Sequence, residues 1–235
     1  MKKLLDLTKK YMQNFYTQVK KIIDTSKKNR IFLKNKKDLS MLTKNDLIIQ
    51  KRLINLIKKF FPDVKQFICE ENFNIQNFKK IDFEKPFAII DPIDGTENFF
   101  TQNDMYGTFI SVNSKSSIKV DLIYIPTKKL MITRNNILDI FKRARKNNDV
   151  TLLSTKCLTK RYKGSKYRIY GSSAYSFYKF IIGDVNEFIY CDGAKIWDCF
   201  TGLRLTSLIN CKMKIKEKNW IKKPTFKTEF KLKWI

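Results

Sequence analysis

The chain has 235 residues, of which 43% are hydrophobic and 14% aromatic. This content is enough to bury a core and excludes general disorder. Lysine and arginine number 48 against 22 acidic residues, so the formal net charge is +26. Histidine is absent, which excludes histidine-dependent hydrolytic triads and histidine-ligated zinc sites. Any acid–base or metal chemistry must therefore rest on carboxylates, hydroxyls, thiols, lysine or tyrosine.

The positive charge predicts attraction to anions of many kinds, weakened by salt. The lysines occur in nearly every segment rather than in one arm, which favours a composition bias over a dedicated nucleic-acid face. No apolar run approaches the ~18 residues of a membrane helix. The opening Met1–Asp6 is interrupted by charge before a signal segment can form. We therefore expect a cytoplasmic protein that does not enter a membrane.

The cysteines show no Cys-x-x-Cys pair and no metal-site spacing, and their number is odd. This pattern predicts buried free thiols in a reducing compartment. The five residues are Cys69, Cys157, Cys191, Cys199 and Cys211.

In the first part of the chain, apolar residues at three- and four-residue spacing predict a long helix over Leu4–Ile23 with a core-facing stripe. A second helix is predicted over Ile49–Phe61, stopped by Pro62. Two short apolar runs follow, Phe67–Cys69 and Phe87–Ile90, and acidic residues come directly after each. Both runs are typical of buried strands that deliver carboxylates at their ends.

From residue 106 to residue 133, β-branched and aromatic residues with turn residues between them predict adjacent strands of an antiparallel sheet. The polar stretch Lys142–Asp149 is the predicted boundary between two halves. The basic tail from Lys212 shows no pattern that we assign. The elements predicted between these two segments are a strand near Thr151–Ser154, a helix after Gly171, a strand near Glu187–Tyr190 and a helix from Asp198 to about Leu208.

The most informative segment runs from Asp91 to Thr96, directly after the second apolar run. Asp91 and Asp94 stand three residues apart on a predicted turn, where two carboxylates can share hard divalent cations such as Mg²⁺. Gly95 permits backbone angles that other residues resist, and a helix beginning here offers N–H groups to an anion. From these residues alone, the carboxylates could equally cap a helix, with Gly95 as an ordinary turn glycine.

The letters Asp91-Pro92-Ile93-Asp94-Gly95-Thr96, followed by Asn98-Phe99, resemble the D-P-I-D-G-T-x-N-F signature of the inositol monophosphatase family. Further elements resemble that family in its own order. They are Leu42–Asp46, Cys69-Glu70-Glu71 (resembling G-E-E), Gly171–Ala174 (resembling G-S-[AS]-A) and Trp197–Gly202 (resembling W-D-x-A-A-G). The resemblance covers roughly residues 36–208.

The resemblance implies a layered α/β fold, the αβαβα sandwich of this family. It implies a single domain over residues 1–235, with an N-terminal α+β half (about 1–145) and a C-terminal α/β half (about 146–235). The expected activity is Mg²⁺-dependent hydrolysis of a small phosphate monoester, of the inositol monophosphate or sugar phosphate type, inhibited by lithium. Two or three Mg²⁺ ions are expected, with a phosphorylated metabolite as partner and a homodimer as the family's usual assembly.

The resemblance also assigns the metal-site residues. Glu70, Asp91 and the carbonyl of Ile93 would hold one Mg²⁺, and Asp91, Asp94 and Asp198 would hold a second. Such ions activate water and neutralise phosphate oxygens, so this chemistry needs no histidine.

Catalysis would rest on Glu70 and on Thr96, oriented by Asp46, which together position a water for in-line attack on phosphorus. The substrate-binding residues implied are Asp94, Gly95, Thr96, Ser172, Ser173 and Asp198. Asp46 is equally an N-cap of the helix that follows it, and Ser172 and Ser173 equally cap theirs.

Several positions depart from the family. Cys191 stands where inositol-preferring members commonly carry a substrate-binding Glu, which puts inositol preference in doubt. Cys69 replaces the usual Gly. The expected E-A-G-G turn after Leu208 is missing, so the terminal strands and helix are expected to be abbreviated, and Lys142–Asp149 is expected to be shortened.

Two alternative functions stay open. The Gly171-Ser172-Ser173 variant resembles the bisphosphate nucleotidase branch, which acts on phosphoadenosine phosphate. The +26 charge motivates an RNA- or transcription-machinery-binding member with little catalysis, although the scattered lysines do not favour nucleic acid.

Overall fold

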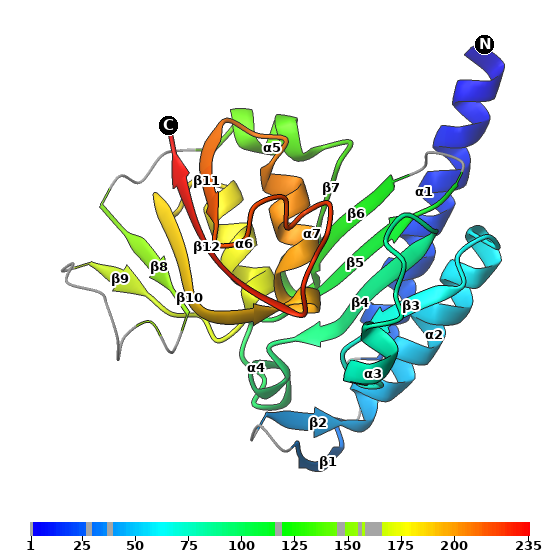
Figure 1. The fold of residues 1–235 in the computed structure, drawn as a ribbon, viewed down its shortest axis with the longest axis horizontal. Coiled ribbons are helices and arrows are strands. Elements are labelled where there is room, and N and C mark those ends of the chain that lie inside the picture. Colours follow the sequence, from blue (N-terminus) through cyan, green and yellow to red (C-terminus); the bar gives the residue numbers. More distant parts are fainter. Residues whose placement is uncertain are drawn as a thin grey trace.

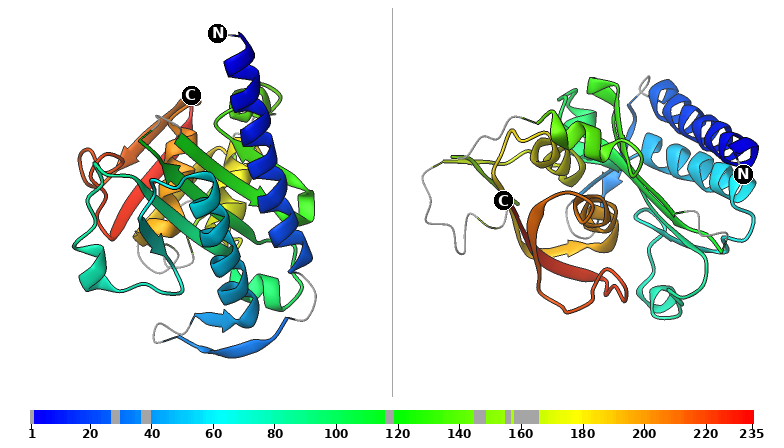
Figure 2. Two further views of the ribbon diagram at one scale, coloured as in Figure 1. Left: turned by 90° about the vertical axis from the view of Figure 1, so that its right-hand side faces the viewer. Right: turned by 90° about the horizontal axis from the view of Figure 1, so that it is seen from above.

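Two amphipathic helices, α1 (Lys2–Thr25) and α2 (Lys44–Phe60), form the first layer and lie side by side (Figure 2). Their apolar stripes bury Phe15 and Leu53 in the core beside the first sheet. Both helices confirm the predictions.

The computed structural model describes residues 2–26, 30–36, 40–115, 119–144, 149–154, 157 and 166–235. Within those residues, no helix is both long and apolar enough to span a bilayer.

The second layer is a five-stranded sheet in the order β3-β4-β5-β6-β7 (Figure 1). β3 runs parallel to β4, and the remaining neighbours pair antiparallel, as predicted for residues 106–133. Helices cover both faces, so β4 is buried along its whole length. The strands are β3 (Gln66–Cys69), β4 (Phe87–Asp94), β5 (Gly107–Asn113), β6 (Lys119–Ile125) and β7 (Leu130–Thr133).

The third layer contains α6 (Ser173–Ile181) and α7 (Ile196–Thr206), which lie between the two sheets (Figure 2, right). The second sheet has the order β11-β12-β10-β8-β9. This arrangement confirms the layered α/β sandwich and the elements predicted after residue 150. The strands are β8 (Thr151–Leu153), β9 (Tyr167–Arg168), β10 (Glu187–Lys195), β11 (Cys211–Ile215) and β12 (Lys227–Trp234).

The tail to which we assigned no pattern forms β11 and β12, paired antiparallel. In β12 the inward side chains alternate with lysines and a glutamate, a period of two that predicts a half-buried strand. This signal was present in the sequence and was missed.

Short elements complete the chain. A hairpin of β1 (Phe32–Asn35) and β2 (Met41–Thr43) lies beside α4, where the rings of Phe32 and Phe100 are 6.1 Å apart. The predicted boundary at Lys142–Asp149 falls partly outside the described residues. The remaining elements are α3 (Ile75–Phe78), α4 (Thr96–Phe100), a 3-10 turn at Pro126–Lys128 and α5 (Ile137–Lys142).

One strand from each sheet becomes irregular near the junction of the two sheets. The pairing of β4 with β5 shifts between Asp91 and Asp94, and that of β10 with β12 shifts between Tyr190 and Ala194. The expected turn after Ile90 is therefore corrected, since β4 continues through both aspartates. Such irregularities redirect side chains at a strand's end. Here they bring polar groups from both halves of the chain together.

The expectation of five free thiols is wrong for two of them. A disulfide joins Cys157 to Cys191, with 5.4 Å between their Cα atoms. The reason is tertiary, because the parallel pairing of β8 with β10 sets Leu153 beside Ile189 and so brings the two cysteines into range. Cys69 and Cys199 are free and buried, and Cys211 is free and partly buried.

The contact between α6 and α7 depends on Gly202. A Cβ atom at this position would lie 2.4 Å from Cδ2 of the Phe177 ring. We expect Gly202→Ala to lower the free energy of unfolding by about 1–3 kcal/mol through overpacking, despite alanine's better helix propensity. Urea unfolding measures this change. Ser207→Ala, at the end of the same helix, should stay within about 0.5 kcal/mol. Equal effects of the two substitutions would contradict the packing argument.

Candidate metal centre

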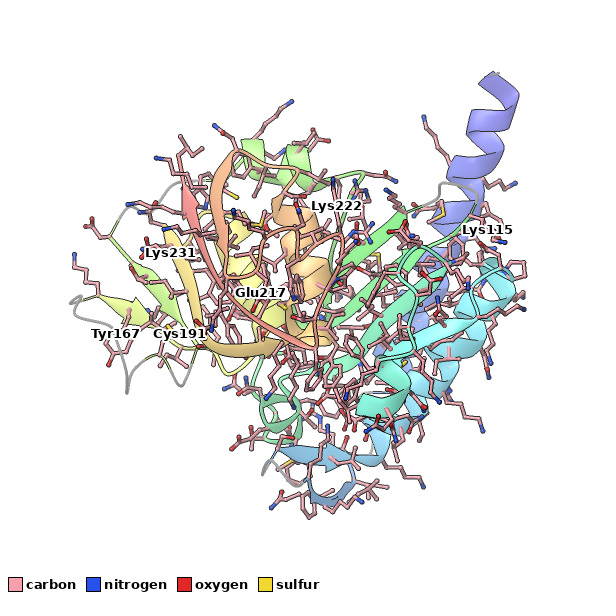
Figure 3. All side chains as sticks on the ribbon, in the orientation of Figure 1. Lys115, Tyr167, Cys191, Glu217, Lys222 and Lys231 are labelled. Atoms are coloured by element: carbon pink, nitrogen blue, oxygen red, sulfur yellow. A yellow bond between two sulfur atoms is a disulfide. The ribbon has the colours of Figure 1, made fainter. Side chains whose placement is uncertain are left out.

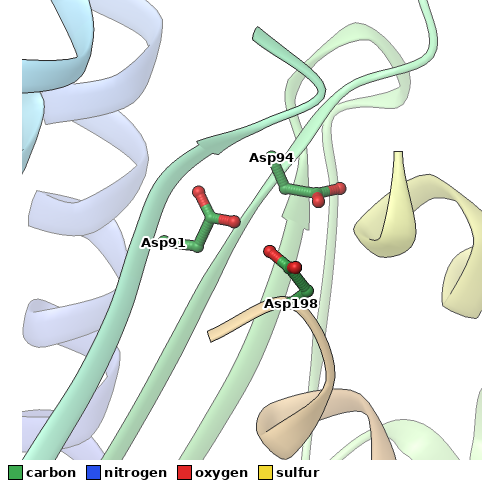
Figure 4. A group of neighbouring side chains, drawn as sticks. All are labelled: Asp91, Asp94 and Asp198. Atoms are coloured by element: carbon green, nitrogen blue, oxygen red, sulfur yellow. The ribbon is translucent and has the colours of Figure 1, made fainter. Parts of the chain in front are cut away.

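Three aspartates converge where the two halves of the chain meet (Figure 4). Asp91 and Asp94 come from the irregular end of β4, and Asp198 comes from the first turn of α7. One carboxylate oxygen from each lies within 4.8 Å of the others. Asp91 and Asp94 are buried. The structure thus brings together residues 107 positions apart in sequence that we had predicted to share a metal.

The cluster is electrostatically unfavourable without a cation. Burial, followed by the negative charge of Glu70, raises the pKa values of Asp91 and Asp198 well above their usual range. Burial also raises the pKa of Asp94 to about 6, against hydrogen bonds that lower it. Oδ1 of Asp91 is buried without a hydrogen-bond partner. Buried like charges with an unpartnered oxygen fit a divalent cation, because hard cations take carboxylate oxygen ligands.

Asp94 is held by the start of α6. Its Oδ2 accepts a hydrogen bond from the Ser172 hydroxyl and another from the backbone N–H of Ala174 at 2.6 Å. Ser172 also accepts from the backbone N–H of Tyr175 at 3.1 Å, so it caps the helix as well as contacting Asp94. The expected helix cap at Ser172 is therefore confirmed. The helix N-terminus favours the negative carboxylate.

Gly95 is required by the close approach of two segments. Its φ of +85° is in the left-handed region, and a Cβ atom there would lie 2.8 Å from Cβ of Ser172. A side chain at this position would separate the turn after β4 from α6. Gly95 thus serves the site through its backbone.

Glu70 lies at the end of β3, beside β4, and is paired with a residue that sequence analysis did not identify. Nζ of Lys36, from the segment after β1, is 2.8 Å from Oε1 of Glu70 and 2.8 Å from Oε1 of Glu71. Glu70 is close enough for its charge to raise the pKa of Asp91. No sequence signal distinguishes Lys36 from the other lysines.

The expectation that Asp46 is the N-cap of α2 is wrong, because Thr43 is the N-cap and Asp46 is the third residue of the helix. Its Oδ2 accepts from the backbone N–H of Thr43 at 2.7 Å, completing a capping box at the start of α2. Its Oδ1 lies 3.3 Å from the Thr96 hydroxyl, which is also 3.0 Å from the carbonyl oxygen of Ile93. Burial raises the pKa of Asp46 to about 6. Thr96 is thereby fixed between β4 and α2.

A polar cleft of about 160 Å³ opens beside the aspartates. Asp94, Asp198 and Ser173 line it, together with Tyr190, a residue that sequence analysis missed. Burial, then the charges of Asp198 and Asp94, raises the pKa of Tyr190 well above its usual value. The sequence indicates only that Tyr190 belongs to a strand, and nothing in it points to the site. The cleft's other lining residues are Leu153, Ser154, Ile169, Gly171, Ser172, Ser176 and Phe188.

A second buried carboxylate fixes α7 against the first sheet. Asp121 on β6 is fully buried, and its Oδ1 lies 3.1 Å from Nε of Arg204 on α7. Its Oδ2 accepts from Arg134 at 2.6 Å. Ser111 donates to Asp121 at 2.8 Å and lies 2.9 Å from the hydroxyl of Thr201, also on α7. These contacts set the position of the helix that carries Asp198.

Comparison with known proteins assigns the chain to a family. The model of the inositol monophosphatase family matches residues 4–206, and the chain belongs to that family.

Solved structures of similar fold cover nearly the whole chain. A staphylococcal inositol monophosphatase, in a lithium chloride-soaked inhibitory complex, has a TM-score of 0.75 at 18% identity, covering 97% of this chain and 90% of that one. The Thermotoga maritima inositol monophosphatase has a TM-score of 0.67 at 19% identity, covering 99% and 92%. A dual inositol monophosphatase/NADP phosphatase, complexed with NADP and Ca²⁺, has a TM-score of 0.74 at 18% identity, covering 97% and 91%.

A curated relative matches part of the chain. The 3'(2'),5'-bisphosphate nucleotidase CysQ of Haemophilus influenzae is 26% identical over 117 residues. The match covers 50% of this chain and 39% of that relative.

The raised pKa of Asp94 predicts a pH dependence of metal-free stability. The folded form holds this proton up to about pH 6, whereas the unfolded chain releases it near 3.8. The stabilisation is therefore present below pH 3.8 and is lost as pH rises through about 6. In EDTA, the unfolding free energy of Asp94→Asn minus that of wild type should rise with pH. We expect this difference to increase by on the order of 2 kcal/mol from about pH 4 to about pH 7. Urea unfolding at both pH values measures this, and a pH-independent difference would contradict it.

The ion pair of Asp121 with Arg204 predicts energetic coupling. We expect Arg204→Met to cost about 2–4 kcal/mol of unfolding free energy, because it removes a partner of a buried charge. The double variant Asp121→Leu/Arg204→Met should lose less than the sum of the two single losses. A double-mutant cycle by urea unfolding measures the coupling. Additive losses would contradict it.

Proposed function

We propose that this protein is a Mg²⁺-dependent phosphatase acting on a small phosphate monoester. The observation that supports this most strongly is the convergence of the carboxylates of Asp91, Asp94 and Asp198, together with the buried Oδ1 of Asp91 that has no hydrogen-bond partner. Family membership supports the same reaction class.

The donor set suits two ions that share Asp91. Glu70, Asp91 and the carbonyl of Ile93 would hold one Mg²⁺, and Asp91, Asp94 and Asp198 would hold a second. When bound, Mg²⁺ lowers the pKa of water and neutralises charge on phosphate oxygens. Because Nζ of Lys36 contacts Oε1 of Glu70, the other carboxylate oxygen of Glu70 would be the one that holds the ion.

The chain's own groups supply positioning. Asp46 orients the Thr96 hydroxyl, and Thr96 with Glu70 directs a water toward phosphorus. Ser172 and the N–H of Ala174 keep Asp94 directed into the cleft. Gly95 and Ser173 border the phosphate position. Because phosphoryl transfer depends chiefly on positioning and charge stabilisation, fixed groups of this kind are the main contribution that the chain can make.

The substrate is an inositol monophosphate or sugar phosphate type of ester. The 160 Å³ cleft is lined by hydroxyls and carboxylates that suit a phosphate and a polar leaving group. A 3'(2'),5'-bisphosphate nucleotidase is the second candidate, supported by the similarity to CysQ over half of the chain. Inhibition by Li⁺ follows from either proposal.

The mechanism is tested by Asp91→Asn, which removes the shared ligand and keeps the side-chain shape. Phosphate release in Mg²⁺ should fall at least about 100-fold. Asp104→Asn, at an exposed residue 3.7 Å from Lys128, is the matched control and should retain activity within about twofold. Isothermal titration of Mg²⁺ into both variants separates loss of metal binding from loss of turnover. Full activity in Asp91→Asn would overturn the mechanism.

The substrate class is tested by comparing inositol 1-phosphate, sugar phosphates and phosphoadenosine phosphate at equal concentration, with and without Li⁺. A higher kcat/KM on the first two supports the main proposal. A preference for phosphoadenosine phosphate supports the nucleotidase.

A further inference from the structure

The outer face of the second sheet is rich in lysine and differs from the face that packs on α6 and α7. Inward residues of β12 such as Phe230 and Leu232 belong to the core. Their outward neighbours are Lys231 and Lys233, both exposed. Figure 3 marks Lys231 on β12 and Cys191 on the neighbouring β10. Within the described residues, the helices lie on the other side of this sheet (Figure 2, right).

Lysines on this face stand opposite one another. The register of β11 and β12 pairs Lys212 with Lys233 and Lys214 with Lys231. Like charges directly opposite on a sheet destabilise it. Lys231 is compensated by Glu187, 2.8 Å away. Lys212, Lys214 and Lys233 have no carboxylate partner among the residues that the structure describes, so this face carries uncompensated positive charge.

A cavity of about 420 Å³ lies on this face, within the size range of small-molecule sites. Its apolar wall includes Leu153, Ile189 and the disulfide between Cys157 and Cys191. Its charged lining consists of Lys214, Lys216, Lys231 and Glu229. Glu229 pairs with Lys216 at 3.0 Å. Lys214 therefore remains available to an anion at the edge of an apolar pocket.

We propose that this cavity binds a small organic anion with an apolar body, separately from the metal centre. The apolar part of the ligand contacts Ile189 and Leu153, and its phosphate, sulfonate or carboxylate group contacts Nζ of Lys214. Each half of the ligand matches a half of the cavity, because apolar surface is removed from water while the charge pairs at the rim. The cavity and the catalytic cleft share Leu153 and Tyr190 in their linings, so they adjoin across the end of β10.

The probe that tests this is 8-anilinonaphthalene-1-sulfonate, an aromatic anion whose fluorescence rises in apolar sites. We expect saturable binding of one equivalent to the full chain in EDTA, weakened by Lys214→Glu about tenfold and by Ile189→Thr about threefold. Lys212→Glu is the matched control, because Lys212 lies on the same strand and face, also opposite a lysine, but outside the cavity. It should change the dissociation constant less than about twofold.

Two further measurements separate this site from the metal centre and from general charge. Asp198→Asn should bind the probe as wild type does, even if it abolishes phosphatase activity. Inorganic phosphate, which has no apolar body, should not displace the probe at equal concentration, whereas adenosine monophosphate should. Near-ultraviolet circular dichroism confirms that each variant is folded. No saturable binding, equal losses in Lys214→Glu and Lys212→Glu, or displacement by phosphate alone would overturn the proposal.

Discussion

Mutual repulsion among buried carboxylates is the constraint on which the rest of this structure depends. Asp91, Asp94 and Asp198 lie within a few ångströms of one another, next to Glu70, in surroundings that disfavour charge. A fold can hold such a group only if other contacts fix each member in place. Here those contacts come from donors at the start of α6, from Lys36 and from the burial of the strands. The stability of the surrounding layers therefore sustains a locally unfavourable cluster of carboxylates.

The layered architecture brings together carboxylates from two adjacent layers, the first sheet and the helices that pack on it. β4 contributes two aspartates where its pairing with β5 becomes irregular, and α7 contributes the third from its first turn. Asp121 then uses Arg204 to fix α7 against the first sheet. The ion pair of Asp121 with Arg204 thus helps to position Asp198 relative to the two aspartates of β4. Such indirect support explains why a site of so few residues involves most of the chain.

Sequence reasoning found the parts of the site that lie in short, fixed spacings. Asp91, Asp94 and Thr96 belong to one continuous segment, and Asp198 follows a tryptophan in a second motif, so their types and order sufficed. Lys36 and Tyr190 could not be found in this way, because only the tertiary fold distinguishes them from many similar residues. The disulfide was missed for the same reason, since a sequence separation of 34 positions between its cysteines says nothing of strand pairing. The C-terminal strands were predictable in principle from their alternation.

The absence of a side chain at Gly202 has a mechanical consequence. α6 and α7 touch there through the Phe177 ring, with no room for an added methyl group. α6 carries the donors to Asp94, and α7 carries Asp198 itself. Because neither helix can shift at this contact without displacing the other, the donors to Asp94 and the carboxylate of Asp198 are held at a fixed separation from each other.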